Sequence, residues 1–204
     1  MVVSTNSEEI ARVARSAGAE VPFLRPDTLS QANSSSLSAI LHALHWFRDS
    51  EKWTPDFVAF CPPTNPFIRS QTIKEMFNRL AARPDRNSIV SIAPPKTHPF
   101  RIVERQKDGT IRNGLITIES KSINDIERSQ DWPAVWEGSP ACRLTRSSYF
   151  LSLPLQNGPQ SAQGKTYDVQ SALGYEVTQL EAFDIDEEQD FSIAAALAQT
   201  LRHT

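Results

Sequence analysis

The stretch FVAFCPPTNP, residues 57–66, decides the fold class of this chain. Residues 57–61 form an unbroken apolar run of strand length, which is typical of a parallel strand that is buried on both faces. The prolines that follow end the run abruptly. In open α/β sheets, ligands bind beyond the carboxyl ends of the strands. Residues 61–65 are therefore the first candidate for a binding loop.

Helical and strand patterns alternate on both sides of this stretch. Upstream, residues 34–36 are three serines that can cap a helix, whose apolar stripe follows over residues 37–44. Downstream, Ser70 can cap another helix, and residues 89–93 form a second apolar run. This rhythm predicts an α/β fold with a mostly parallel sheet and helices on both faces. We expect a single domain over residues 1–204.

The two ends of the chain continue the same rhythm. Asn6, with Glu9 three residues later, matches a capping box at the start of a helix that Gly18 can end. Residues 21–24 read as a short strand or extended segment. Near the carboxyl end we expect a strand over residues 175–183 and then a final helix.

The middle of the chain departs from this pattern. Asp108-Gly109 is a strong hairpin signal between two short β-prone segments. Residues 114–146 are richer in polar residues, with tryptophans interleaved. We therefore expect an insertion at about residues 100–148 that lies outside the main sheet.

Composition excludes several classes of function. The 204 residues carry 21 Lys and Arg against 24 Asp and Glu, a net charge of -3, so a broad nucleic-acid-binding surface is not expected. No apolar run is long enough for a membrane helix, and the first residues lack the features of a signal peptide. Cys61 and Cys142 alone make neither a disulfide framework nor a zinc site. We expect a cytoplasmic protein.

Two carboxylates lie together after the last predicted strand. Asp184 and Asp186 share one side of an extended segment, and a pair of this kind can hold Mg²⁺ together with substrate phosphates. Alternatively, Asp186 caps the final helix, because Gln189 follows three residues later.

Cations and a histidine supply further candidates. Arg25 ends an apolar segment, where it is either a phosphate or carboxylate ligand or an ordinary surface residue. Arg143 and Arg146 either grip an anionic substrate or are solvated. His98 lies in a proline-rich loop, as a site residue or simply as part of the loop.

An ordered set of segments along the chain resembles the acylneuraminate cytidylyltransferase (CMP-sialic acid synthetase) family. The segments are VVSTNSEEIA (2–11), VPFLRP (21–26), PTNP (63–66), His98-Pro99, and FDID (183–186) with Asp190. The resemblance implies a Rossmann-like nucleotidyltransferase fold. It also implies transfer of CMP from CTP to an acidic, nonulosonic sugar, with Mg²⁺ and release of pyrophosphate. Family members are homodimers, in which an inserted segment reaches towards the partner's site.

The resemblance also implies roles for particular residues. Arg25 corresponds to an arginine that contacts the nucleotide phosphates and acts in catalysis, and Asp184 with Asp186 to the Mg²⁺ ligands, Asp184 being catalytic. Thr64 and Asn65 lie in the loop that lines the nucleotide-sugar crevice. The residues expected near the sugar are Arg143, Arg146 and His98.

The chain also departs from the family pattern. The family begins with a strand and a phosphate-gripping loop, a unit of about 30 residues that has no counterpart here, so the resemblance is to an N-terminally truncated member. The Asn-Gly pair expected after Arg143 is also missing. One alternative is a non-catalytic member that binds nucleotide or pairs with a full-length subunit. Another is a sugar nucleotidyltransferase that uses a different base.

Overall fold

The computed structural model describes residues 1–154 and 165–201. The helices are α1 (Glu8–Ser16), α2 (Ser36–Ser50), α3 (Ser70–Ala81), α4 (Ser147–Ser152) and α5 (Glu188–Leu201). The strands are β1 (Phe57–Phe60), β2 (Ser88–Ala93), β3 (Glu104–Arg105), β4 (Ile111–Arg112), β5 (Glu137–Arg146) and β6 (Ala172–Glu176). None of the helices in these ranges has the length and apolarity that a membrane span requires.

The main sheet is mixed, and the prediction of a mostly parallel sheet is wrong in this respect. Its strand order is β1-β5-β2-β6. β2 and β6 are parallel, whereas β5 runs antiparallel to both of its neighbours. The reason is that the chain leaves the sheet after β2 and returns from the same edge through β5, a connection that antiparallel strands allow without a crossover helix.

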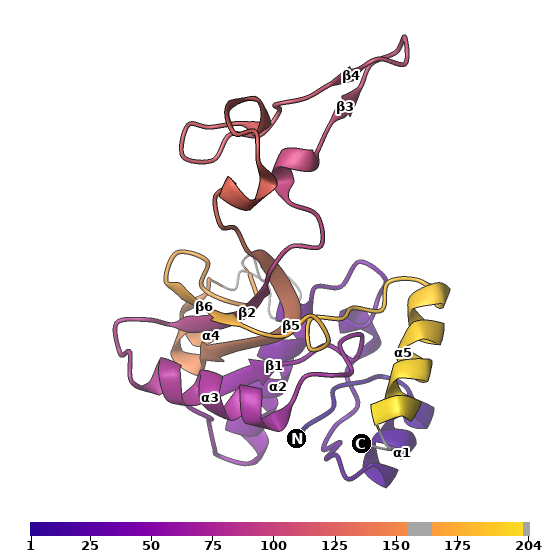
Figure 1. Ribbon diagram of the computed structural model, residues 1–204. Helices are drawn as coiled ribbons and strands as arrows, with labels where there is room; N and C mark the ends of the chain where they lie inside the picture. The colour runs from indigo at the N-terminus through magenta and orange to yellow at the C-terminus, as the bar shows by residue number, and fades with distance from the viewer. Residues whose placement is uncertain (155–164, 202–204) are drawn as a thin grey trace.

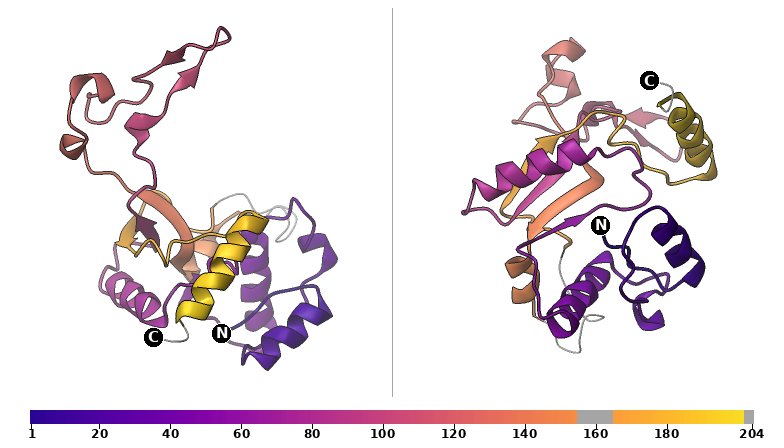
Figure 2. Two further views of the ribbon diagram at one scale, coloured as in Figure 1. Left: turned by 45° about the vertical axis from the view of Figure 1, so that its right-hand side comes forward. Right: turned by 90° about the horizontal axis from the view of Figure 1, so that it is seen from below.

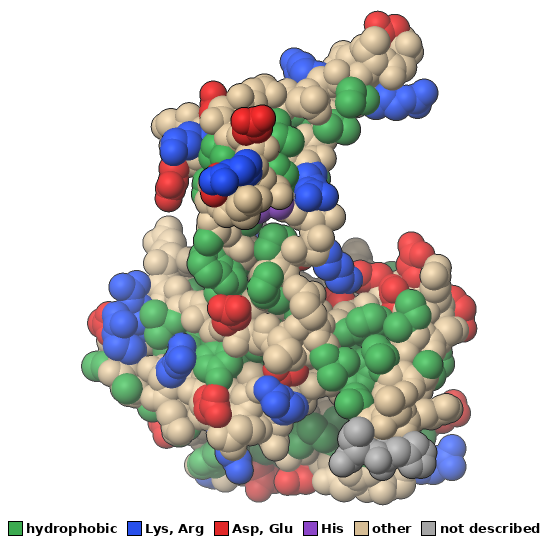
Figure 3. Space-filling model, viewed as in Figure 1, with side chains coloured by type: hydrophobic (Ala, Val, Ile, Leu, Met, Phe, Trp, Pro, Cys, Tyr) green, Lys and Arg blue, Asp and Glu red, His purple; other side chains and the backbone are tan. Residues whose placement is uncertain are grey.

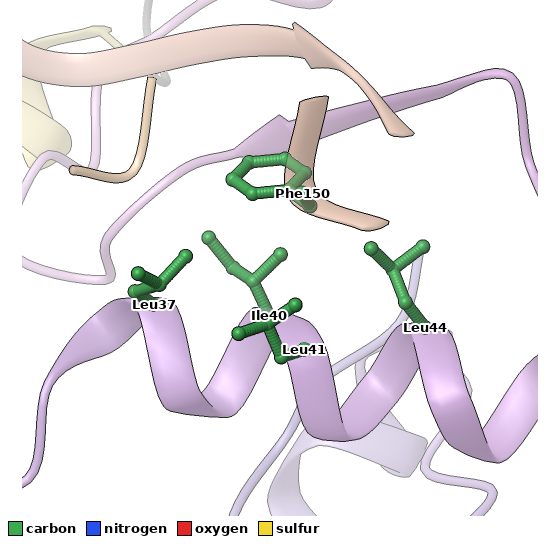
Figure 4. Packing of buried hydrophobic residues seen from close by; sticks show 5 residues of the cluster. All are labelled: Leu37, Ile40, Leu41, Leu44 and Phe150. Carbon is green, nitrogen blue, oxygen red and sulfur yellow. The ribbon is translucent and has the colours of Figure 1, made fainter. Parts of the chain in front are cut away.

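Helices cover both faces of this sheet, as the sequence predicts. On one face α2 packs against β1 and α4 through a cluster shown in Figure 4. Its buried members are Leu37, Ile40, Leu41, Leu44 and Phe150. On the other face, Met76 and Leu80 of α3 pack against Ile89 and Leu144 of the sheet. Figure 2 shows the resulting layers from below, with α3 and α2 on opposite sides of the strands.

The amino-terminal segment differs from its prediction in two details. Ser7, not Asn6, caps α1, because its side chain accepts a hydrogen bond from the backbone of Ile10 at 3.3 Å. Of the two alternatives for residues 21–24, the strand is not formed in the described structure, and a parallel bridge between Val2 and Glu20 lies just before them.

The caps of the next two helices give one confirmation and one correction. Ser35, within the predicted serine run, caps α2 through its side chain, which accepts from the backbone of Ser38 at 3.1 Å. Ser70 is the first residue of α3, and Arg69 stands at the N-cap position without a side-chain capping bond.

An extended lobe, residues 97–136, projects from the sheet between β2 and β5 (Figure 1). It carries the predicted hairpin, β3 paired with β4, joined through the turn at Gly109. The expectation that residues 114–146 lie outside the main sheet is wrong for their last ten residues, since Glu137–Arg146 is the long strand β5. The last strand also differs, because β6 ends at Glu176 and residues 177–183 are not a strand.

Candidate functional site

The loop after β1 is held against the segment that follows β6. The side-chain amide of Asn65 donates to the carbonyl oxygen of Phe183 at 2.9 Å. The backbone N–H of Ile185 donates to the carbonyl oxygen of Thr64 at 3.0 Å. The rings of Phe67 and Phe183 also meet edge to face, with centroids 6.0 Å apart. These contacts bring the predicted residues Thr64 and Asn65 beside Asp184.

Two buried side-chain oxygens in this place have no hydrogen-bond partner among the described residues. They are Oδ1 of Asn65, a residue that is only 2% exposed, and Oδ1 of Asp184. A buried polar atom left unpaired costs free energy and calls for an explanation. A bound ligand would explain both unpaired atoms, because amide and carboxylate oxygens can coordinate Mg²⁺.

These residues can bind Mg²⁺ only if the substrate and water supply the remaining ligands. Over residues 1–154 and 165–201, no three His, Cys, Asp or Glu side chains gather closely enough to hold a metal ion. Mg²⁺ is usually bound by one or two carboxylates, with substrate phosphates and water completing its shell. Asp184 meets the protein's part of that requirement.

Asp186 lies one residue beyond the Ile185 contact, at the approach to α5. The backbone N–H groups of Asp186 and Glu187 donate to the carboxylate of Asp190, at 3.1 and 3.0 Å. The side chain that binds the backbone before α5 is therefore that of Asp190. The role of Asp186 as a metal ligand stays a prediction.

A carboxylate that the sequence did not single out anchors the same segment. Glu181 is 2% exposed and accepts hydrogen bonds from Arg69, Thr72 and Thr178. Burial raises the pKa of Glu181, but these hydrogen bonds outweigh it and bring the pKa to about 2. Glu181 therefore ties the segment before Asp184 to the start of α3. A lone glutamate in an irregular segment gives no sequence signal for this role.

Arg25 is half-buried beside the first polar loop. Its backbone N–H donates to the carbonyl oxygen of Thr5 at 2.7 Å, and its Nε donates to Oγ of Ser30 at 2.9 Å. Burial, and next the charge of Arg25, lower the pKa of His42. The structure thus brings Arg25 to the loop at residues 4–6.

Arg143 and Arg146 lie on β5, opposite the two ends of β1. Arg143 is opposite Phe60, the last residue of β1, and Arg146 is opposite Phe57, the first. Of the two, only Arg143 lies at the carboxyl end of β1, and strand ends of this kind are where ligands bind in open α/β sheets. Its guanidinium carbon is 5.9 Å from the ring centroid of Tyr167.

The side chain of Arg146 forms hydrogen bonds to backbone carbonyl groups. Its guanidinium donates to the carbonyl oxygens of Arg86 and Leu80, both at 3.0 Å, and it lies over the ring of Phe57. Arginine near the end of a helix stabilises the free carbonyls there. The geometry favours this stabilising role at the end of α3 over the predicted contact with substrate.

His98 lies in the part of the lobe nearest the sheet, where residues 98–100 contact residues 132–133; we call this part the neck. Its Nε2 is 3.0 Å from the carbonyl oxygen of Pro133, and its Nδ1 accepts from the backbone N–H of Phe100 at 3.2 Å. Its ring also contacts those of Phe100 and Trp132. Both ring nitrogens are engaged, so His98 holds the neck together in this structure.

A cavity of about 430 Å³ opens beside this neck. It lies at the carboxyl end of β2 and the start of β5. Its lining is formed by Pro95, Lys96, Thr97, Pro99, Val135, Trp136 and Glu137. The sequence analysis singled out His98 in this loop but not Lys96, Trp136 or Glu137. Only the placement of β5 in the sheet brings the last two to this cavity.

No protein-family profile matches the chain. The structure of CMP:2-keto-3-deoxy-manno-octonic acid synthetase complexed with CTP superposes with a TM-score of 0.62 at 11% identity, covering 98% of this chain and 80% of that one. The fold is therefore an α/β nucleotidyltransferase fold.

Two curated proteins are similar to this chain in sequence. The chain is 32% identical over 101 residues to CMP-N,N'-diacetyllegionaminic acid synthase of Legionella pneumophila, covering 48% of this chain and 41% of that protein. It is 25% identical over 199 residues to N-acylneuraminate cytidylyltransferase of Escherichia coli, covering 98% of this chain and 42% of that protein. The chain thus spans less than half the length of either relative. The chain is therefore distantly similar to proteins of the acylneuraminate cytidylyltransferase, or CMP-sugar synthetase, family.

Proposed function

We propose that this chain is a cytidylyltransferase, which activates an acidic, sialic-acid-like sugar with CTP to give the CMP-sugar and pyrophosphate. The observation that carries the proposal is the contact between the loop of Asn65 and the segment of Asp184. There the Oδ1 atoms of both residues are buried and have no hydrogen-bond partner among the described residues. The named activities of the two relatives support the class of reaction.

Residues at this contact, together with Arg25 beside Thr5, have separate proposed roles toward the nucleotide. Asp184 and Asp186 would hold Mg²⁺, which, when bound, neutralises charge on the phosphates and favours the ionised form of the attacking hydroxyl. Thr64 and Asn65 line the nucleotide, their loop being fixed to residues 183–185. Arg25 offers its guanidinium to the negative charge that develops on the phosphates during transfer.

The neck cavity is the proposed place of the sugar. Lys96 supplies a positive charge for the carboxylate of the sugar, and Trp136, which is 52% exposed, offers an apolar ring face to its carbon skeleton. Glu137 can accept hydrogen bonds from hydroxyl groups. Arg143, at the carboxyl end of β1, is a further candidate for the carboxylate of the sugar, and His98 positions the loop that lines the cavity.

We further propose that the lobe mediates a homodimer. Several of its large apolar side chains are exposed, which is typical of a surface that meets a partner. They are Ile102, Val103, Ile111, Leu115 and Trp136. The space-filling view shows the molecule hollowed between this lobe and the body that carries α5 (Figure 3).

Asp184→Asn tests the proposed reaction. The variant keeps the shape of the side chain and removes its charge, so we expect Mg²⁺-dependent release of pyrophosphate from CTP to fall about 100-fold or more, a loss of about 2.7 kcal/mol of transition-state stabilisation. The measurement is pyrophosphate release with a panel of nonulosonic acids, together with calorimetric titration of CTP with and without Mg²⁺.

Asp49→Asn is the matched control, because this carboxylate is exposed on α2 and paired with Arg48. Equal turnover by wild type and Asp184→Asn would remove the assignment of the metal site. Mg²⁺-dependent binding of CTP without turnover of any sugar would favour instead a chain that binds nucleotide and acts with another subunit.

A further inference from the structure

The two cysteines of the chain face each other across neighbouring strands. β1 ends at Phe60, which lies opposite Arg143 in the antiparallel register with β5. One step further along the same register, Cys61 lies opposite Cys142. Both are free thiols in this structure. Residues distant in the sequence thus form a cross-strand pair.

The backbone places this pair at a position that suits a disulfide. In the register of β1 with β5, Asp56 lies opposite Ser147, one step before the pair of Phe57 with Arg146. The N–H of Ser147 donates to the carbonyl oxygen of Asp56 at 2.9 Å, so these two residues are a hydrogen-bonded pair. Hydrogen-bonded and non-hydrogen-bonded pairs alternate along an antiparallel ladder, which makes Cys61 and Cys142 a non-hydrogen-bonded pair. Such pairs have Cα atoms about 4.5 Å apart, within the range of about 4.4–6.8 Å found for disulfides.

The other edge of β5 agrees with this assignment. The N–H of Cys142 points away from β1 and donates to Oγ of Ser91 on β2 at 3.0 Å. Its carbonyl oxygen accepts from the same hydroxyl at 3.0 Å. The backbone of Cys142 is therefore fixed from the β2 side.

The two thiols differ in their environment. Cys61 is exposed, whereas Cys142 is fully buried beneath α3. A side-chain hydrogen bond between them lowers the pKa of the Cys61 thiol and, together with burial, raises that of Cys142. Because the thiolate is the reactive form, Cys61 is the thiol that an oxidant meets first.

We propose that Cys61 and Cys142 form a reversible thiol–disulfide site that reacts with glutathione disulfide. The thiolate of Cys61 attacks one sulfur of glutathione disulfide, whose S–S bond breaks and releases one glutathione thiolate. The sulfur of Cys142 then attacks Cys61, its proton passes to the departing second glutathione, and the Cys61–Cys142 bond forms. Two electrons move from the two cysteines to glutathione disulfide, which leaves as two glutathione molecules.

The site lies where a bond would restrain the candidate binding loop. Cys61 immediately precedes residues 62–65, which carry the Asn65 contact to Phe183. A bond to β5 fixes the first residue of that loop to the sheet. The proposal concerns the thiols alone and stands apart from the proposed transferase reaction.

The experiment treats the reduced, folded chain with glutathione disulfide, blocks remaining thiols with N-ethylmaleimide and determines intact masses and linked peptides. We expect a product that has lost two hydrogens, carries no glutathione and returns to the dithiol with dithiothreitol. It should exceed the glutathione adduct about tenfold or more, because the neighbouring thiol is an intramolecular reactant.

Two variants serve as controls. Cys61→Ser alters an exposed side chain and should leave Cys142 unmodified, whereas Cys142→Ala should accumulate a glutathione adduct on Cys61. Since replacing a buried residue can unfold the chain, the wild-type masses decide the matter. A wild-type product that keeps glutathione on Cys61, a disulfide between two chains, or no reaction at all would overturn the proposal.

Discussion

Glu181 shows how one buried charge positions a site from a distance. Its carboxylate is held by Arg69 and Thr72 of the α3 region and by Thr178 of its own segment. Glutamate in an unfolded chain has a pKa of about 4.3, whereas in the folded chain the pKa of Glu181 is about 2. A lowered folded-state pKa means that the ionised form stabilises the fold.

The stabilisation from Glu181 therefore depends on pH in a defined direction. It is fully present above about pH 5 and is lost as the pH falls towards 2, the folded-state value. We predict that Glu181→Gln lowers the free energy of unfolding by about 1–3 kcal/mol at pH 7 and flattens its dependence on pH between these limits. Urea unfolding at several pH values measures both effects.

Glu127→Gln is the control for this prediction, because Glu127 is exposed in the lobe. Its unfolding curve should follow that of the wild type at every pH. If Glu181→Gln keeps the acid sensitivity of the wild type, other carboxylates determine that sensitivity.

At the scale of elements, the sequence predicts the helices and the hairpin better than the sheet. The stripe of α2 and the turn at Gly109 are local patterns, and both appear as predicted. β5 is missed because EGSPACRLTR mixes glycine, proline and charged residues, and only its neighbours on both sides make it a strand. Tertiary context here overrides a weak β propensity.

In the candidate site, too, local features are predictable from the sequence and long-range contacts are not. Asn65 stands out because its loop follows the apolar run of β1, and Asp184 because Asp186 lies two residues later; both are local signals. The bond between the two loops, the anchor at Glu181 and the cavity beside Trp136 arise only from long-range packing. Arg143 and Arg146 are equivalent in the sequence, and the register with β1 alone separates their roles.

The neck of the lobe offers a test at this scale. Trp132 contacts the rings of His98 and Phe100, and the guanidinium carbon of Arg101 lies 5.5 Å from its ring centroid. We predict that Trp132→Ala loosens the lobe by about 1–3 kcal/mol, less than the cost of removing a fully buried tryptophan because Trp132 is half-buried, while the sheet keeps its stability.

Hydrogen exchange resolved by residue measures this effect. Amides of residues 98–135 should exchange faster in Trp132→Ala, whereas those of β2 and β5 should keep their protection. Trp53→Ala is the control, because Trp53 is 55% exposed and remote from the neck. Equal loss of protection in the lobe and the sheet would show that the two unfold as one unit.

At the scale of the whole molecule, the lobe is a long projection that carries apolar side chains away from the core (Figure 1). Ile111 on β4 is 62% exposed, the highest exposure among the large apolar residues of the lobe. A symmetric dimer uses the same patch on both subunits, so one substitution alters the interface twice. A charge placed at Ile111 would therefore destabilise the dimer from both subunits at once.

Ile111→Glu is therefore predicted to weaken the dimer about tenfold or more, because two carboxylates would be buried without partners. Sedimentation velocity over a range of concentrations measures the shift from dimer to monomer. Ile10→Glu is the matched control, since Ile10 is 54% exposed on α1, far from the lobe. A wild-type chain that stays monomeric throughout, or a control that dissociates as readily as Ile111→Glu, would show that the exposed face of the lobe has another purpose.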